Sequence, residues 1–227
     1  MDASIVVLVG GATRRWWPDG ELLDFLAKRG IRRVQEPEEW RGFAAFAQER
    51  LAGTRDLSIV EIGTQFGGTF FTFYNLFHDS LAMLASVDLR LYARIDMAYP
   101  REHYADEYRA FDRLVGELGD ARIRVIVGDS HLPSTRDALS RALGGRQIDL
   151  CFIDGEHGYE GVRADYLMYG GMVRPGGLIC FHDIVTPETS AGPLPVGVRR
   201  CWEEIRAGRR WTEFTAGAEK GIGVIEA

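Results

Sequence analysis

Cysteine is scarce in this sequence, which has only Cys151, Cys180 and Cys201 among 227 residues. The three are scattered and form no Cys-x-x-Cys pair, so a disulfide framework is excluded and a cysteine zinc site is disfavoured. Two of them lie inside apolar runs that are expected to form buried strands. We therefore expect free, buried thiols in a reducing compartment.

Long hydrophobic runs and an excess of positive charge are also lacking. No stretch approaches the roughly 18 apolar residues of a membrane span, and the short apolar run 5–9 has no basic flank of the kind a secretory signal carries. The formal net charge is −6, whereas a nucleic-acid binder needs a basic surface. These absences predict a cytoplasmic protein with neither a membrane nor a nucleic acid as partner.

What is present is the composition of an ordinary globular protein. Hydrophobic residues make up 46% and charged residues 26% of the chain, which allows a sizeable core. The length suits one α/β domain better than two. We predict a single domain, 1–227, with a helical N-terminal or lid segment, 1–50, and a cofactor-binding core, 55–227.

Apolar runs alternate with amphipathic segments along the chain. Runs rich in Ile, Val, Leu and Cys predict strands at 57–62, 82–87, 123–127, 148–153 and 178–181. Spacing near 3.6 residues predicts helices from residue 68 and at 104–118, 134–143, 159–173 and 197–206, with a turn at 175–177. The last two runs, 211–215 and 222–226, suggest an antiparallel pair. This order predicts an α/β fold with a mostly parallel sheet and helices on both faces.

Polar residues gather where the predicted strands end. In open parallel sheets, ligands bind beyond the carboxyl ends of the strands. Exclusion of charge from the core would explain any one of these residues alone, but six at corresponding positions indicate a shared site. The six are Glu61, Asp88, Asp129, Asp154, His182 and Asp183.

A glycine turn follows the first of these strands. Gly63, Gly67 and Gly68 have the spacing G-x-x-x-G-G, which differs from the G-x-G-x-x-G dinucleotide fingerprint. Glu61 just before the turn would repel a pyrophosphate but suits a cationic ligand such as the amino end of S-adenosylmethionine. An ordinary strand–helix turn is the structural alternative.

The chain resembles the class I S-adenosylmethionine-dependent methyltransferases over roughly residues 40–227. The matching pieces are the EIGTQFGG turn, Ser86-Val87-Asp88, Gly128-Asp129-Ser130, Phe152-Ile153-Asp154 and Arg174-Pro175-Gly176-Gly177. The resemblance implies a Rossmann-like fold with a seven-stranded, mostly parallel sheet and one antiparallel strand. It also implies cofactor contacts at Glu61, Gly63, Thr64, Gln65, Gly67, Gly68, Asp88, Asp129, Ser130 and Asp154. Gln65 departs from the glycine that many members carry.

A narrower resemblance is carried by Asp154-Gly155-Glu156-His157 together with Phe181-His182-Asp183. It looks like the metal-dependent sugar O-methyltransferases of macrolide pathways and the cephalosporin-type enzymes. That resemblance implies a divalent ion, Mg²⁺ or Mn²⁺, on Asp154, His182 and Asp183, with Asp154 and His157 as catalytic residues and the histidine as base.

Position 182 departs from this narrower pattern, because the macrolide enzymes carry a carboxylate there. Imidazole suits Mn, Fe or Zn better than Mg²⁺. His182 therefore either ligates a different metal, faces the substrate or holds Asp183. A polar pocket without metal is the structural alternative.

The function predicted from the whole pattern is metal-assisted methyl transfer from S-adenosylmethionine to a hydroxyl of a small molecule, such as a sugar or another natural-product intermediate. Open alternatives are a metal-independent N- or O-methyltransferase and a non-catalytic partner protein with this fold. A nicotinamide-dependent oxidoreductase is disfavoured by the glycine spacing. The resemblance also favours a homo-oligomer. The loop 186–196 is a candidate for acceptor contacts. One tryptophan of the Trp16-Trp17 pair is a candidate for capping the cofactor pocket or for an oligomer contact, and packing against the first helix is the structural alternative.

Overall fold

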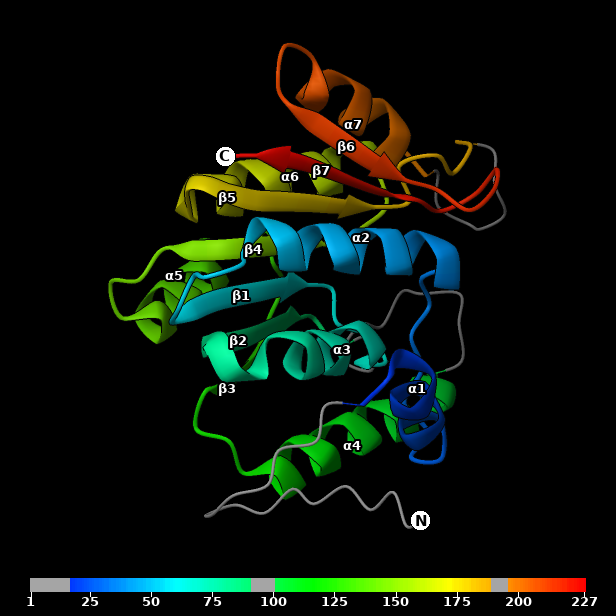
Figure 1. Ribbon diagram of the computed structural model, residues 1–227, viewed down its shortest axis with the longest axis vertical. Coiled ribbons are helices and arrows are strands. Elements are labelled where there is room, and N and C mark those ends of the chain that lie inside the picture. The colour runs from blue at the N-terminus through cyan, green and yellow to red at the C-terminus, as the bar shows by residue number, and fades with distance from the viewer. Residues whose placement is uncertain (1–16, 91–100, 189–195) are drawn as a thin grey trace.

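The computed structural model describes residues 17–90, 101–188 and 196–227 (Figure 1). A seven-stranded sheet of order β3-β2-β1-β4-β5-β7-β6 forms its centre. The strands are β1 (Leu57–Ile62), β2 (Leu81–Asp88), β3 (Ile123–Val127), β4 (Ile148–Ile153), β5 (Val173–His182), β6 (Trp211–Phe214) and β7 (Ile222–Glu226). The helices are α1 (Asp19–Ala27), α2 (Pro37–Arg50), α3 (Gly68–Phe77), α4 (Arg101–Leu118), α5 (Pro133–Leu143), α6 (Tyr159–Tyr169) and α7 (Val198–Arg206), with 3₁₀ turns η1 (His78–Ser80) and η3 (Gly170–Met172).

Strands β1 to β5 run parallel, and only β7 runs against them. β1 pairs in parallel with β2 and with β4, while β7 lies antiparallel between β5 and β6. The predicted seven-stranded sheet with one antiparallel strand is therefore confirmed. The order reverses at β1 and β4, and ligands of open α/β sheets bind beyond the carboxyl ends of the strands at this kind of switch point.

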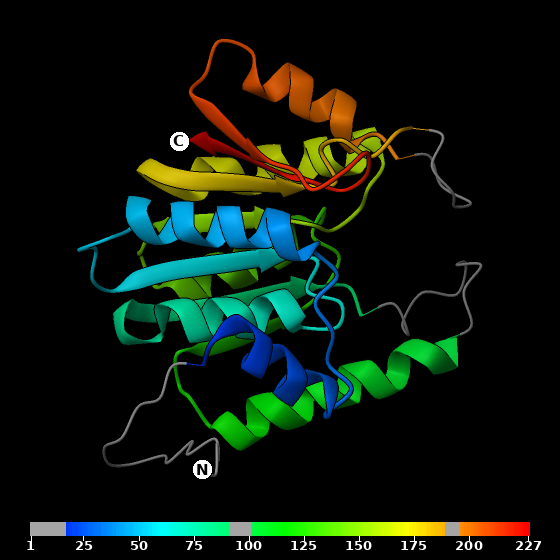
Figure 2. The same cartoon turned by 45° about the vertical axis from the view of Figure 1, so that its right-hand side comes forward.

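Helices cover both faces of the sheet (Figures 1 and 2). Helices α1, α2, α3 and α4 pack with Ile59 and Phe152 into one hydrophobic cluster, whereas α5, α6 and α7 pack with Val60 and Ile153 into the other. Successive strand residues point to opposite faces, yet both faces are buried. This explains why these strands read as continuous apolar runs rather than as alternating ones.

The N-terminal segment brings helix α2 onto the sheet next to the site. Pro37 occupies its first turn, where the missing amide hydrogen costs nothing. Glu36 and Glu39 form a reciprocal capping box, which satisfies otherwise unpaired amides at the helix start. Trp40 and Phe43 bury the inner face of the helix.

Two predictions near β5 are wrong. The helix predicted over 159–173 ends as α6 at Tyr169, because Gly170 and Gly171 continue it only as the 3₁₀ turn η3. The turn predicted at 175–177 lies inside β5 instead. Ile148 pairs with Val173 while Leu150 pairs with Leu178, so the four residues between Val173 and Leu178 bulge out of the ladder.

Some predictions fall on residues outside the described ranges. These include Trp16, most of the loop 186–196 and the first part of the N-terminal segment 1–50. Among the described helices, none is both long and apolar enough to cross a membrane.

Candidate functional site

A small pocket opens at the carboxyl end of the sheet, beside the glycine turn. Six of its lining residues were predicted to contact a cofactor. Its lining consists of Arg32, Val34, Glu61, Gly63, Thr64, Gln65, Phe66, Gly68, Thr69 and Asp154. The predicted residues Gly67, Asp88, Asp129 and Ser130 do not line this pocket.

The glycines of this turn are required by close backbone packing. A Cβ on Gly63 would lie 2.1 Å from the carbonyl oxygen of Asp154, and the φ of Gly63 is +84°. A Cβ on Gly68 would lie 2.2 Å from the carbonyl oxygen of Arg32. The turn therefore holds the loop after β4 and the N-terminal segment against β1.

Glu61 is a buried carboxylate with an unused acceptor. It is 1% exposed, and its Oε2 has no hydrogen-bond partner within the described structure. Burial raises the pKa of Glu61 well above its ordinary range, and the nearby charge of Asp154 adds to the increase. A cationic ligand in the pocket would offset this cost, so the orphaned oxygen fits the ammonium or sulfonium of S-adenosylmethionine.

Asp88 ends β2 in a fixed orientation. Its Oδ2 accepts the backbone N–H of Gln65 at 2.7 Å, and its Oδ1 accepts that of Arg90 at 2.6 Å. The Ser86 hydroxyl donates to Thr64 Oγ1 at 2.7 Å. These bonds tie the end of β2 to the glycine turn and hold the carboxylate at the edge of the sheet.

Asp129 and Ser130 follow β3 and lie in a polar cluster of their own. The Asp129 carboxylate accepts the backbone N–H of His131 at 3.0 Å, and the Ser130 carbonyl accepts the hydroxyl of Tyr169 at 2.7 Å. His131 Nε2 lies 3.4 Å from the fully buried carboxylate of Asp165. Interaction with Asp165, outweighing burial, raises the pKa of His131 to about 9.

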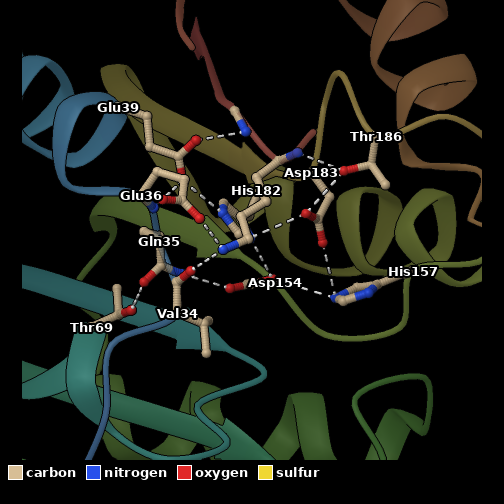
Figure 3. Close-up of polar contacts among 12 residues, drawn as sticks. Val34, Gln35, Glu36, Glu39, Thr69, Asp154, His157, His182, Asp183 and Thr186 are labelled. Carbon is tan, nitrogen blue, oxygen red and sulfur yellow. Dashed lines mark hydrogen bonds and ion pairs between the residues drawn. The ribbon is translucent and has the colours of Figure 1, made fainter. Parts of the chain in front are cut away.

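Asp154, His182 and Asp183 come together as the narrower resemblance implied (Figure 3). Each offers one ligand atom, and these atoms all lie within 4.8 Å of one another. His182 Nδ1 is 3.2 Å from Asp154 Oδ1 and 3.7 Å from Asp183 Oδ1. Two carboxylates and one imidazole at this separation are a donor set that fits a divalent ion.

His157 lies at the open side of this cluster. Its Nε2 is 3.4 Å from Asp154 Oδ1 and 3.5 Å from Asp183 Oδ2, and its side chain is 46% exposed. Asp183 has a φ of 63°, a left-handed conformation that ends β5 abruptly. His157 is thus held by both aspartates while part of its ring remains exposed to solvent.

Opposite charges balance each other in this cluster. Burial alone would raise the pKa of Asp154, but His182 and His157 together hold that pKa well below its usual range. Burial opposes charge on His182, but Asp154 and Glu39 raise the pKa of His182 well above its ordinary value. Partial burial also opposes charge on His157, but Asp154 and then Asp183 raise the pKa of His157 above its ordinary value.

Sequence reasoning missed two residues from the N-terminal segment. Gln35 Nε2 donates to Asp154 Oδ2 at 2.9 Å, and Gln35 Oε1 accepts the hydroxyl of Thr69 at 2.5 Å. Glu39 Oε1 lies 3.1 Å from His182 Nε2. The available signal was a glutamate four residues before Phe43, on the same apolar stripe of α2, within the predicted helical segment 1–50.

The fold and the site define an α/β protein with the pocket of the glycine turn and an acid–imidazole cluster at one end of its sheet. A sequence model of the family described as "Methyltransferase domain" matches residues 60–184. The chain belongs to this methyltransferase family, and the class I methyltransferase fold is confirmed. No curated protein matches the chain by sequence.

Several solved structures share the fold. An O-methyltransferase from Bacillus cereus in complex with SAH has a TM-score of 0.54 and 21% identity, with coverage of 92% of this chain and 90% of that one. MycE of the mycinamycin biosynthetic pathway, in complex with Mg and SAH, has a TM-score of 0.56 and 17% identity over 93% of this chain but 55% of that one. CalS11, a TDP-rhamnose 3'-O-methyltransferase of calicheamicin biosynthesis, has a TM-score of 0.55 and 14% identity over 89% and 92%.

Proposed function

We propose that this protein transfers the methyl group of S-adenosylmethionine to a hydroxyl of a small molecule, with a divalent ion and His157 assisting. One observation carries the proposal. Asp154 both lines the pocket of the glycine turn and belongs to the cluster with His182 and Asp183. A cofactor in the pocket and an acceptor at the cluster would therefore lie next to each other, as an in-line displacement requires.

The cofactor part rests on the turn after β1. Glu61 offers its unused carboxylate oxygen to the cationic methionine end, while Thr64, Gln65 and Gly68 line the rest of the pocket. We assign Asp88, Asp129 and Ser130 to the nucleoside half, because they end the next two strands at the same edge. The SAH bound in the Bacillus cereus enzyme and in MycE supports this choice of cofactor.

The metal part rests on Asp154, His182 and Asp183. A divalent ion there would lower the pKa of an acceptor hydroxyl and orient it. His157 Nε2 stands 3.4 Å and 3.5 Å from the two aspartates, so a proton accepted on that ring would be stabilised by their charges. The exposed part of the ring would be accessible to an acceptor.

For the acceptor we propose a sugar or another natural-product intermediate. The support is the likeness to MycE and CalS11, of which the second is a TDP-rhamnose 3'-O-methyltransferase. The support from this chain's own residues is the cluster of Asp154, His182 and Asp183, which is suited to polarising a hydroxyl. The oxygens of Asp154 and Asp183 favour an acceptor that presents hydroxyl groups over one that is wholly apolar.

A metal-independent methyltransferase is the second candidate, and His182 favours it. The ring lies between Asp154 at 3.2 Å and Glu39 at 3.1 Å, and the pKa of His182 is raised. A doubly protonated imidazole would then occupy the centre of the cluster in place of an ion. His157 would remain the base in this version.

Calorimetry on the purified, chelator-treated protein tests the cofactor and metal parts. We expect micromolar binding of S-adenosylmethionine, no binding of NADP, and a separate isotherm for Mn²⁺. SAH release would then be followed with nucleotide sugars, glycosides and catechols as acceptors. Activity that survives chelation would establish the metal-independent version, whereas absence of S-adenosylmethionine binding would refute the cofactor assignment.

A further inference from the structure

Glu39 is a buried acid that the proposed reaction does not itself use. It stands at the third position of α2 and is 1% exposed. Its Oε2 accepts the backbone N–H of Gly221 at 2.7 Å, and its Oε1 accepts that of Glu36 at 2.9 Å. Within the described ranges no lysine or arginine pairs with it. Its remaining partner is the Nε2 of His182 at 3.1 Å.

This contact fixes which nitrogen of His182 carries a hydrogen. A carboxylate only accepts hydrogen bonds, so Nε2 must donate to Glu39. In a neutral ring the lone pair then lies on Nδ1. That atom faces Asp154 Oδ1 at 3.2 Å and Asp183 Oδ1 at 3.7 Å (Figure 3).

We propose that Glu39 is a positioning residue that holds His182 with its Nε2–H toward α2 and its Nδ1 toward the two aspartates. The site thereby gains a nitrogen donor and selects Mn²⁺ over Mg²⁺. This inference rests on the metal part of the proposed function. A carboxylate behind a ligating histidine fixes its tautomer and raises its basicity, and imidazole suits Mn²⁺ better than Mg²⁺.

The N-terminal segment acquires a defined role from this arrangement. The capping box and Gly221 hold both oxygens of Glu39, so the carboxylate cannot turn away from His182. Gln35, four residues earlier, holds the other oxygen of Asp154 in the same manner. The segment before and within α2 thus sets the orientation of two members of the cluster.

The test is calorimetric titration of the full chain with Mn²⁺ and with Mg²⁺ alone, without cofactor. We expect Glu39→Gln to weaken Mn²⁺ binding by about 10- to 100-fold. Glu36→Gln is the matched control, because it makes the same change in the same capping box at a residue that does not contact His182. It should leave the Mn²⁺ affinity unchanged, and thermal melting of both variants checks their folding.

Pulsed electron paramagnetic resonance of bound Mn²⁺, compared between the wild type and His182→Glu, supplies a second readout. Nitrogen coupling from a ligating imidazole is expected in the wild type and should disappear in His182→Glu. In His182→Glu combined with Glu39→Gln, the ratio of Mn²⁺ to Mg²⁺ affinity should fall, because the donor set becomes all oxygen.

The outcomes separate this inference from the proposed function. Mn²⁺ binding that is equal in Glu39→Gln and Glu36→Gln, or that lacks nitrogen coupling, would overturn the role of Glu39 and leave the metal site standing. Absence of any metal binding in the wild type would overturn both, while binding of S-adenosylmethionine would still support the methyltransferase itself.

Discussion

The two ends of β4 carry aspartates in opposite situations. Asp149, at the start of the strand, accepts the backbone N–H of Ser58 at 2.8 Å and the Nε of Arg174 at 2.5 Å. Asp154, just past the end of the strand, faces two histidines and the Gln35 amide. Only the first is neutralised by a permanent cation.

This difference separates stability from function. A guanidinium stays charged at any working pH, so Asp149 is a fixed structural anchor. The partners of Asp154 can lose a proton or give way to an ion, so its charge would be available for the proposed chemistry. The amino end of the sheet repeats the structural pattern at β3, where Asp120 pairs with Arg122.

The largest effect is expected from Asp154→Asn. The change removes the charge shared by the pocket and the cluster, so methyl transfer should fall at least about 10³-fold, equivalent to about 4 kcal/mol. Mn²⁺ binding should be lost in the same variant. Asp149→Asn is measured by the same rate assay and the same Mn²⁺ titration. If it reduced activity as much as Asp154→Asn, the contrast between the two ends of β4 would be refuted.

His157→Gln should come next. Removing a general base typically costs about 10²- to 10⁴-fold in rate. We expect kcat to fall by about 10² while the affinity for S-adenosylmethionine, measured by calorimetry, stays unchanged. A variant with normal kcat would exclude His157 as the base.

Asp149→Ala should act on stability instead. It leaves Arg174 and the Ser58 amide without their buried acceptor, which should lower the free energy of unfolding by about 2 kcal/mol. Urea denaturation measures this, and cofactor affinity in native buffer should match the wild type. If Asp149→Ala lost cofactor affinity without losing stability, the structural role assigned to the start of β4 would be wrong.

Glu61→Gln should weaken S-adenosylmethionine binding by about tenfold, since a hydrogen bond to a charged group is worth about 1.5–3 kcal/mol and the amide retains part of it. The same change removes a buried acid whose Oε2 has no partner in the described structure, so the thermal midpoint should rise or hold. Unchanged affinity in calorimetry would show that the orphaned oxygen does not face the cofactor.

The smallest effect is a pH dependence at His131. Its pKa is raised to about 9, chiefly by Asp165, so its contribution to stability is complete below about pH 6.5 and is lost as pH rises toward 9. The side chain is 27% exposed, so we expect on the order of 1 kcal/mol. Urea titrations at pH 6 and pH 9.5 should show this difference in the wild type but not in His131→Gln.

Much of the fold was predictable from local pattern. The apolar runs of β1 and β4 predict strands that end at Gly63 and Asp154, because the sheet is covered on both faces and its strands are built mainly from apolar residues. The errors arose where pattern was ambiguous. The helix was predicted to reach residue 173, but α6 ends at Tyr169, and Gly170 and Gly171 follow it as a 3₁₀ turn. The turn predicted at Gly176 is a bulge within β5, because the strand pairs with β4 on both sides of it.

The sequence by itself determined that carboxylates and histidines end the parallel strands, since the carboxyl ends of such strands share one edge. Only the tertiary structure decided that Glu39 and Gln35 join them, because α2 lies far along the chain from β5 and meets it only by packing across the sheet. The local sequence pattern around Glu39 or His182 does not predict this long-range contact. The orientation of His182, and with it the proposed choice of metal, depends on that packing.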